Sequence, residues 1–203
     1  MADQDRVERQ LDFLLEVDRL KRIERVTKIT GGRRRENSAE HSWHVALLAL
    51  VLSEHAVERI ELSTVVTMLL LHDLVEIDAG DTFAYDDTGH ESKEAREQAA
   101  ATRLYGLLPE DQGDRLRALW DEFERGDTPE ARFALALDRL HPVVMNHAND
   151  GDPWMEHGIT RTRVEARNSL IGDHAPALWA AALRRLDDLE ARGRFPDPLV
   201  VEG

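Results

Sequence analysis

One stretch of the sequence decides the fold: Val65-Val66-Thr67-Met68-Leu69-Leu70-Leu71-His72-Asp73. It belongs to an apolar segment from Leu62 to Ile77 that contains no turn signal, and this length favours a buried helix over a strand despite its β-branched residues. An aspartate at the end of a buried element is costly unless it is paired or binds a metal, and an adjacent imidazole is a natural co-ligand. The pair His72-Asp73 therefore predicts a metal site whose other ligands come from elsewhere in the chain.

The rest of the chain also carries helical patterns. Asn37 and Glu40 form a capping box at the start of a second helix, and Thr128-Pro129 supplies an N-cap followed by a first-turn proline. Pro142 lies inside the helix that follows and is expected to kink it or be absorbed locally. The expected helices are residues 4–23, 38–52, 63–76, 92–108, 116–123, 129–144, 161–171 and 176–192. Loops are expected around Gly31-Gly32, over residues 78–89 and over residues 149–153.

These patterns predict an all-α fold, a helical bundle of about eight helices. The chain has 203 residues, which suits one domain, and it contains no internal repeat, low-complexity segment or linker. We therefore expect residues 1–203 to form a single domain.

Composition excludes several classes of function. The net charge of −14 argues against binding of nucleic acid polymers or anionic membranes. No apolar run reaches the roughly 18 residues that a membrane span needs, and the polar start is not that of a signal peptide. With no cysteine, disulfides and thiolate metal sites are impossible, and a cytoplasmic location is expected. An anionic substrate must be captured locally, by a metal or by the basic stretch from Lys21-Arg22 to Arg33-Arg34-Arg35, which is otherwise a solvated basic face.

Two other residues are candidate ligands. His41 lies in the first turn of the second helix, beside Glu40, and Asp138 lies within the apolar segment from Phe133 to Leu140. Taken alone, Asp138 is explained by an ion pair with an arginine, and His41 by a surface or capping position. The order His41, His72-Asp73, Asp138 changes this interpretation.

This ordered set resembles the H…HD…D signature of the HD-domain phosphohydrolase superfamily. The flanking segments, residues 36–42, 72–81 and 154–159, resemble its small 5′-deoxynucleotidase branch in particular. The resemblance covers about residues 20–180 and implies an HD-type bundle with His41, His72, Asp73 and Asp138 as metal ligands. Such a set suits a divalent Mn, Co, Fe, Ni or Zn ion. Only His90 lies between the HD pair and Asp138 as an extra histidine, so one metal ion is expected.

The resemblance also implies a reaction, the hydrolysis of (deoxy)nucleoside 5′-monophosphates, and hence a place in nucleotide metabolism. Glu76 would be the catalytic acid/base, three residues after Asp73 and on the same helix face; Asp81 would position water or substrate. Without the resemblance, Glu76 is explained as a surface carboxylate at a helix end, and Asp81 as a turn residue after Gly80.

Substrate binding is the least determined part of the site. Arg25 matches a phosphate-binding arginine of the branch, but Val26 stands where the branch has a tryptophan associated with deoxyribose recognition. Arg33, Arg34 and Arg35 are further candidates for phosphate contacts. His44 and His141 lie one helical turn from His41 and Asp138 and are expected at the core edge or behind the ligands.

Other functions remain open from the sequence. The same site could act on a cyclic nucleotide, a nucleoside triphosphate, an alarmone or another phosphate ester. The bundle could also be a non-catalytic interaction module, and oxidative chemistry at a di-iron site would need more ligands than this interval offers. A homodimer is a further expectation, since relatives often dimerise.

Overall fold

The computed structural model describes residues 2–86 and 93–197, and most of them are helical, which confirms the predicted all-α class. The predicted helix start at Ser92 and the extra histidine His90 lie outside the described residues. The α-helices are α1 (Ala2–Val17), α2 (Ser38–Leu52), α3 (Leu62–Leu71), α4 (Glu76–Ala79), α5 (Lys93–Tyr105), α6 (Glu110–Arg125), α7 (Pro129–Ala148), α8 (Asp152–Glu156), α9 (Arg161–Asn168), α10 (Leu170–His174) and α11 (Pro176–Ala191). The 3₁₀ helices are η1 (Asp18–Arg22), η2 (Ser53–His55) and η3 (His72–Val75).

Local caps fix the starts of α2 and α7. The Glu40 amide donates to Asn37 Oδ1 (2.9 Å), and the Asn37 amide donates to Glu40 Oε2 (3.1 Å), which confirms the capping box. Thr128 Oγ1 accepts from the amide of Ala131 (3.2 Å), with Pro129 at the first position of α7. Pro142 lies inside α7 without ending it. Both caps matter for the site, since α2 and α7 carry candidate ligands.

The prediction that one helix runs from Ser63 to Glu76 is wrong at both ends. Glu61 is the N-cap, and α3 stops at Leu71, where the chain tightens into η3 before α4. Two buried side chains explain the change: Tyr105 Oη donates to the Leu71 carbonyl (3.3 Å), and Trp120 Nε1 donates to the His72 carbonyl (3.1 Å). Residues three apart are eclipsed in a 3₁₀ helix, so the tightening aligns the side chains along this segment.

The loop expected around Gly31-Gly32 is a short β-hairpin, which corrects the prediction of helices and loops alone. Strands β1 (Glu24–Lys28) and β2 (Arg35–Asn37) pair antiparallel, with Glu24 opposite Asn37. Both glycines have positive φ angles, 90° and 67°, as the turn requires. The strands are too short and too charged to show the apolar alternation of a strand. The hairpin leads directly into α2.

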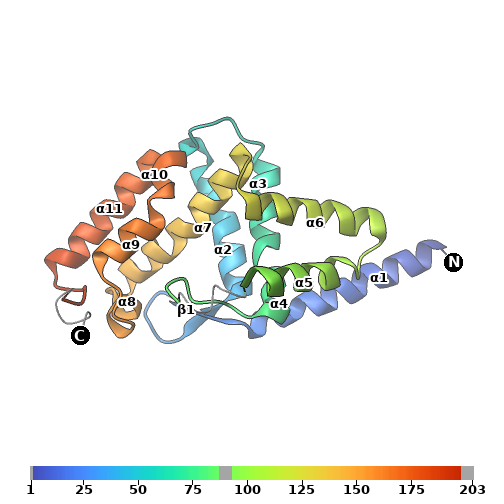
Figure 1. Ribbon diagram of the computed structural model, residues 1–203, viewed down its shortest axis with the longest axis horizontal. Helices are drawn as coiled ribbons and strands as arrows, with labels where there is room; N and C mark the ends of the chain where they lie inside the picture. The colour runs from blue at the N-terminus through green and yellow to red at the C-terminus, as the bar shows by residue number, and fades with distance from the viewer. Residues whose placement is uncertain (1, 87–92, 198–203) are drawn as a thin grey trace.

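The helices pack around a central group (Figure 1). Helices α2, α3 and α7 lie in the middle, α1, α5 and α6 extend toward the N-terminus, and α8 to α11 extend toward the C-terminus. One buried apolar cluster includes Met68 of α3 and Leu137 of α7; a second includes Leu74 of η3 and Leu104 of α5. Segment η3 carries the His72-Asp73 pair and lies between the clusters, because its Leu74 belongs to the second and its His72 ring lies 5.1 Å from the Phe123 ring of the first. None of the described helices has the length and apolar character of a membrane span.

Candidate metal centre

The four predicted metal ligands converge from three elements. Asp138 Oδ1 of α7 lies 3.0 Å from His41 Nε2 of α2 and 3.7 Å from His72 Nε2 of η3. Asp73 Oδ1 lies 3.1 Å from His72 Nε2, and Asp73 Oδ2 lies 3.9 Å from His41 Nε2. His41, His72 and Asp73 are buried, and each offers one ligand atom within 4.8 Å of the others. Segments far apart in the sequence thus bring two imidazoles and two carboxylates together.

The hydrogen bonding of His72 fits a bound cation. Its Nδ1 donates to the Leu69 carbonyl (2.8 Å), so in the neutral ring Nε2 carries a lone pair and no proton. This buried Nε2 has no hydrogen-bond partner in the part of the chain that the structure describes, and it faces the carboxylates of Asp73 and Asp138. Burial alone would lower the pKa of His72, but the two carboxylates raise it to about 9. The two carboxylates favour positive charge at Nε2, which either a proton or a divalent cation supplies, and the donor set suits transition ions.

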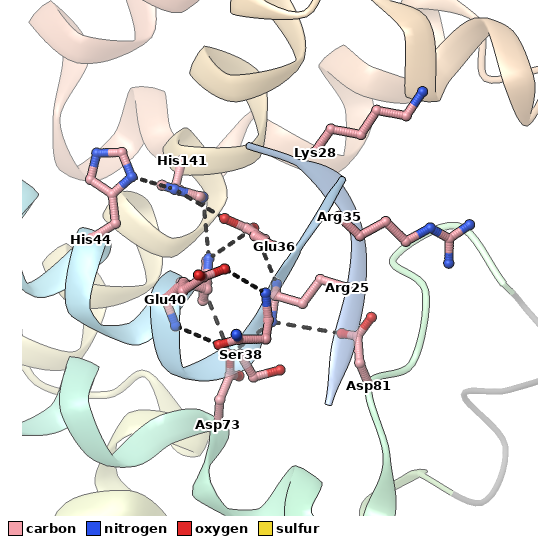
Figure 2. Close-up of polar contacts among 12 residues, drawn as sticks. Arg25, Lys28, Arg35, Glu36, Ser38, Glu40, His44, Asp73, Asp81 and His141 are labelled. Carbon is pink, nitrogen blue, oxygen red and sulfur yellow. Dashed lines mark hydrogen bonds and ion pairs between the residues drawn. The ribbon is translucent and has the colours of Figure 1, made fainter. Parts of the chain in front are cut away.

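His41, His141 and His44 form a row of three imidazoles, of which Figure 2 labels His141 and His44. His41 Nδ1 lies 3.2 Å from His141 Nδ1, and His141 Nε2 lies 3.0 Å from His44 Nδ1. Burial and the neighbouring His41 and His44 hold the pKa of His141 well below its usual range, so its ring is neutral and carries one proton. If His41 Nε2 is to bind a metal, His41 Nδ1–H must donate to His141 Nδ1, and His141 Nε2–H then donates to His44.

We expect replacement of His141 by phenylalanine to weaken metal binding by about 10–100-fold, the usual cost of losing the partner that orients a ligating histidine. His141→Gln keeps a polar group at the position and should lose less. The measurement is competition with a chelating dye. His147→Phe, near the end of the same helix, is the matched control because His147 contacts Asp188 and not the site. An unchanged affinity in the His141→Phe variant would contradict this role.

Arg25 lies among several carboxyl groups. Its NH1 atom lies 2.7 Å from Asp73 Oδ2 and 3.7 Å from both Glu76 Oε1 and Asp81 Oδ1, while its Nε lies 3.5 Å from Glu36 Oε1. Arg25 lies on β1, and Figure 2 shows Glu36, Asp73 and Asp81 around its guanidinium. Only 14% of the side chain is exposed. Burial alone would lower the pKa of Arg25, but the surrounding carboxylates raise it, so the group stays charged.

The two predicted catalytic carboxyls share this environment. Ser38 Oγ donates to Glu76 Oε2 (2.6 Å), and both residues are buried. Burial raises the pKa of Glu76 well above its usual range, and the Asp73 charge adds to this effect. Burial also raises the pKa of Asp81, although Arg25 opposes it. A carboxyl group with a raised pKa can hold a proton for transfer near neutral pH.

These groups open into one cavity with an internal volume of about 140 Å³. Arg25, Asp73, Glu76, Asp81 and Asp138 line one end. Val26 lines the cavity as well, at the position where the resembled branch has tryptophan. The arginines at positions 33–35 are exposed and are not among the described residues that line it, and Arg34 pairs instead with Glu40 (2.6 Å).

Several residues at the site were not singled out from the sequence. Glu36 and Ser38 lie inside the segment that carries the family resemblance, but no spacing rule links them to Arg25 or Glu76. Their common signal is burial, which only the structure gives. Three others also line the cavity: Arg139, Asn146 and Arg167.

Comparison with known proteins places the chain in a family. An HD domain model matches residues 17–179. The human protein 5′-deoxynucleotidase HDDC2 is 32% identical over 135 residues, which are 66% of this chain and 65% of the human protein. The cattle protein of the same name is 33% identical, over 66% of this chain and 64% of its own length. The match thus spans just under two thirds of the length of these curated relatives.

A solved structure extends the likeness to almost the whole chain. It is the crystal structure of a predicted metal-dependent phosphohydrolase from Magnetospirillum magnetotacticum, with 45% identity and a TM-score of 0.91 over 96% of this chain and 98% of that one. A conserved hypothetical protein from Pyrococcus furiosus shares the fold at 21% identity and a TM-score of 0.56, over 77% of this chain and 93% of that one. The matched model, the related sequences and the shared fold agree, and the chain belongs to the HD-domain family.

Proposed function

We propose that this chain is a divalent-metal-dependent phosphohydrolase, a 5′-nucleotidase that converts (deoxy)nucleoside 5′-monophosphates into nucleoside and phosphate. One observation carries the proposal: His72 Nε2 is buried, has no hydrogen-bond partner among residues 2–86 and 93–197, and faces the carboxylates of Asp73 and Asp138, which line the cavity. The names of the relatives support it, since the human and cattle proteins are called 5′-deoxynucleotidases and the bacterial one a metal-dependent phosphohydrolase.

His41, His72, Asp73 and Asp138 would hold one divalent ion, of the Mn, Co, Fe, Ni or Zn class. A second group, Glu36, His41 and His141, also lies within ligand distance. Because both groups use His41, two ions would need that imidazole to bind through both ring nitrogens. The His41–His141 hydrogen bond is better explained by one ion at Nε2 and a proton at Nδ1.

When bound, a divalent ion supplies electrophilic activation of the phosphoryl group and of water. The residues of the chain handle the charges and the protons. The bond between phosphorus and the 5′-oxygen breaks while the oxygen of a water molecule bonds to phosphorus. Glu76, with its raised pKa, donates a proton to the departing oxygen, and Asp81 orients the attacking water and accepts from it. Arg25 keeps these carboxyls in place and offers positive charge to the phosphate.

A second substrate class is favoured by a specific observation. Val26 lines the cavity where the resembled branch places tryptophan, so the deoxyribose preference of that branch does not carry over with the metal site. An HD phosphohydrolase acting on another phosphate ester is the second candidate.

The proposal also covers the domain organisation, the location and the oligomeric state of the protein. We propose that residues 1–203 act as one domain, which is supported by the position of η3 between both apolar clusters. We also propose a cytoplasmic location and a homodimer. The homodimer is supported by large apolar side chains that are exposed, Leu14 and Leu15 of α1 and Trp43 and Val51 of α2. Light scattering should give the mass of two chains in solution; the mass of one chain would contradict the dimer.

A hydrolysis panel tests the function directly. Ribo- and deoxynucleoside monophosphates, diphosphates, triphosphates and cyclic nucleotides are incubated with the metal-loaded protein, and phosphate release is measured. We expect hydrolysis of the monophosphates. Activity on none of these compounds with any divalent ion would instead support a non-catalytic HD module.

Glu76→Gln tests the proposed acid. Glutamine keeps the shape and can still accept from Ser38, but it cannot transfer a proton. The turnover number should fall by about 10²–10⁴-fold, the usual contribution of a general acid or base, while the bound metal stays constant. Full turnover with normal metal content would exclude Glu76 as the acid.

A further inference from the structure

The cavity that the candidate metal ligands line is bounded elsewhere by a second set of side chains, which we call the second chamber. Its walls come from the segment after Asp81, from α7 and from α8 and α9. Apolar side chains form part of it: Phe83, Tyr85, Pro142, Val143 and Trp154. Two arginines line the same chamber, Arg139 directly after the candidate ligand Asp138 and Arg167 near the end of α9.

These two arginines lack the carboxylate partners found elsewhere in the molecule. Arg139 NH1 donates to the Arg167 carbonyl (3.2 Å), and the Arg167 guanidinium lies 5.7 Å from the centre of the Tyr85 ring. Neither side chain forms an ion pair with any carboxylate among residues 2–86 and 93–197. The chain has 40 acidic and 26 basic residues. Because carboxylates outnumber cations, an arginine would be expected to find a carboxylate partner.

Their position is electrostatically unfavourable without a ligand. Both side chains are partly buried. Burial and the like charge of Arg139 lower the pKa of Arg167, against the opposing effects of Tyr85 and Asp138. Bringing two guanidinium groups together out of water costs free energy that an anion between them would offset.

This cationic pair is separate from the charge at the reaction end. Arg25 comes from β1 and is engaged by Asp73, Glu76 and Asp81. The other cavity-lining cation, Lys93, lies 3.4 Å from Glu97. The Arg139–Arg167 pair therefore differs from these cations, because no carboxylate among the described residues forms an ion pair with it.

A buried amide adds a second polar feature. Asn146 Oδ1 of α7 lines the cavity and has no hydrogen-bond partner among the described residues. An unpaired buried acceptor is costly unless a ligand donates to it. A substrate hydroxyl or amino group that reaches this chamber would do so.

We propose that Arg139 and Arg167 form a second anion subsite, which binds a phosphate or carboxylate at the non-scissile end of the substrate, while Asn146 accepts a hydrogen bond from the same substrate. The substrate class is then a phosphomonoester with a second anionic group. This inference rests on the proposed phosphohydrolase function, since it assumes that the scissile phosphate lies at the metal end.

Matched substrate pairs test the inference. A nucleoside 3′,5′-bisphosphate is compared with the nucleoside 5′-monophosphate, and 3-phosphoglycerate with glycerol 3-phosphate, which separates a phosphate from a carboxylate as the second group. For at least one pair, kcat/KM should be about 10–100-fold higher for the doubly anionic member, the value of a charge-assisted contact. Arg167→Gln should remove most of that preference. Arg163→Gln, an exposed arginine over the same Tyr85 ring, is the control and should keep it.

Phosphonate analogues of the same pairs, which cannot be hydrolysed at the P–C bond, separate this inference from the proposed function. Calorimetric binding that is tighter for the doubly anionic analogue and depends on Arg167 would support the subsite even if no ester were hydrolysed. Hydrolysis with no preference within either pair would overturn the subsite and leave the function standing. An equal loss on both members in Arg167→Gln would also overturn it, because the arginine would then bind the scissile phosphate.

Discussion

Asp73→Asn should abolish metal binding and phosphatase activity together. Asparagine preserves the size of the side chain but removes the charge that faces His72 Nε2 at 3.1 Å and Arg25 NH1 at 2.7 Å. Loss of an outer partner costs about 10–100-fold in metal affinity, and loss of a direct ligand should cost more. Turnover should fall by about 10³-fold or more, since electrophilic activation of the phosphoryl group is lost. Metal content by plasma mass spectrometry and phosphate release are the two measurements.

Asp78→Asn is the matched control for this change. Asp78 is an exposed aspartate on α4 that pairs with Arg103 (2.9 Å), close in sequence but outside the cavity lining. The Asp78→Asn protein should bind the metal and hydrolyse substrate as the unmodified protein does. An Asp73→Asn protein that binds the ion as tightly as the unmodified protein would exclude Asp73 as a ligand.

Arg25→Met should be the most destabilising single change in the site. Methionine preserves much of the apolar stem but leaves Glu36, Asp73, Glu76 and Asp81 without the cation that contacts all four. Breaking a buried ion pair from one side costs about 3–5 kcal/mol in the free energy of unfolding. Urea unfolding, monitored by circular dichroism without added metal, measures this loss. Arg25→Lys keeps the charge and should recover part of it.

The stability deficit of Arg25→Met should depend on pH. Burial raises the pKa of both Glu76 and Asp81, and Arg25 opposes each shift, so its removal raises both values further. A carboxyl whose folded pKa lies above its unfolded value destabilises the fold at high pH, and protonation relieves this. The deficit should therefore narrow as pH falls toward about 4–5, near the unfolded values. Arg34→Met, which removes an exposed pair with Glu40, should leave the midpoint nearly unchanged at every pH. An Arg25 deficit that widens on acidification would contradict this explanation.

The helices could be predicted where local signals act alone. The capping box at Asn37 and the Thr128-Pro129 start depend on residues within one turn, and both are confirmed. The end of α3 could not be predicted, because the carbonyls of Leu71 and His72 are taken by side chains from α5 and α6. The hairpin was missed because its strands are short and charged, so that its formation depends on pairing rather than on an apolar pattern.

The site also contains residues that could be predicted from the sequence and residues that only the structure brings together. His41, His72-Asp73 and Asp138 could be grouped from the sequence because polar metal-binding residues in apolar surroundings, in a known order, are a strong pattern. The structure adds that they converge, which spacing alone did not require. The roles of Glu36 and His141 depend on packing between α2, β2 and α7. Arg139 and Arg167 are significant because neither forms an ion pair with a carboxylate among the described residues, and the sequence alone does not show which arginines lack such a pair.

Metal titration of the stripped protein tests the central claim most directly. Aliquots of Mn²⁺ or Co²⁺ are added to metal-free protein, and bound metal and phosphate release from a nucleoside 5′-monophosphate are followed together. Activity should be absent at the start, rise in proportion to bound metal, and reach its plateau at one ion per chain. Activity in the stripped protein, or a plateau only at two ions per chain, would contradict a mononuclear metal-dependent phosphohydrolase.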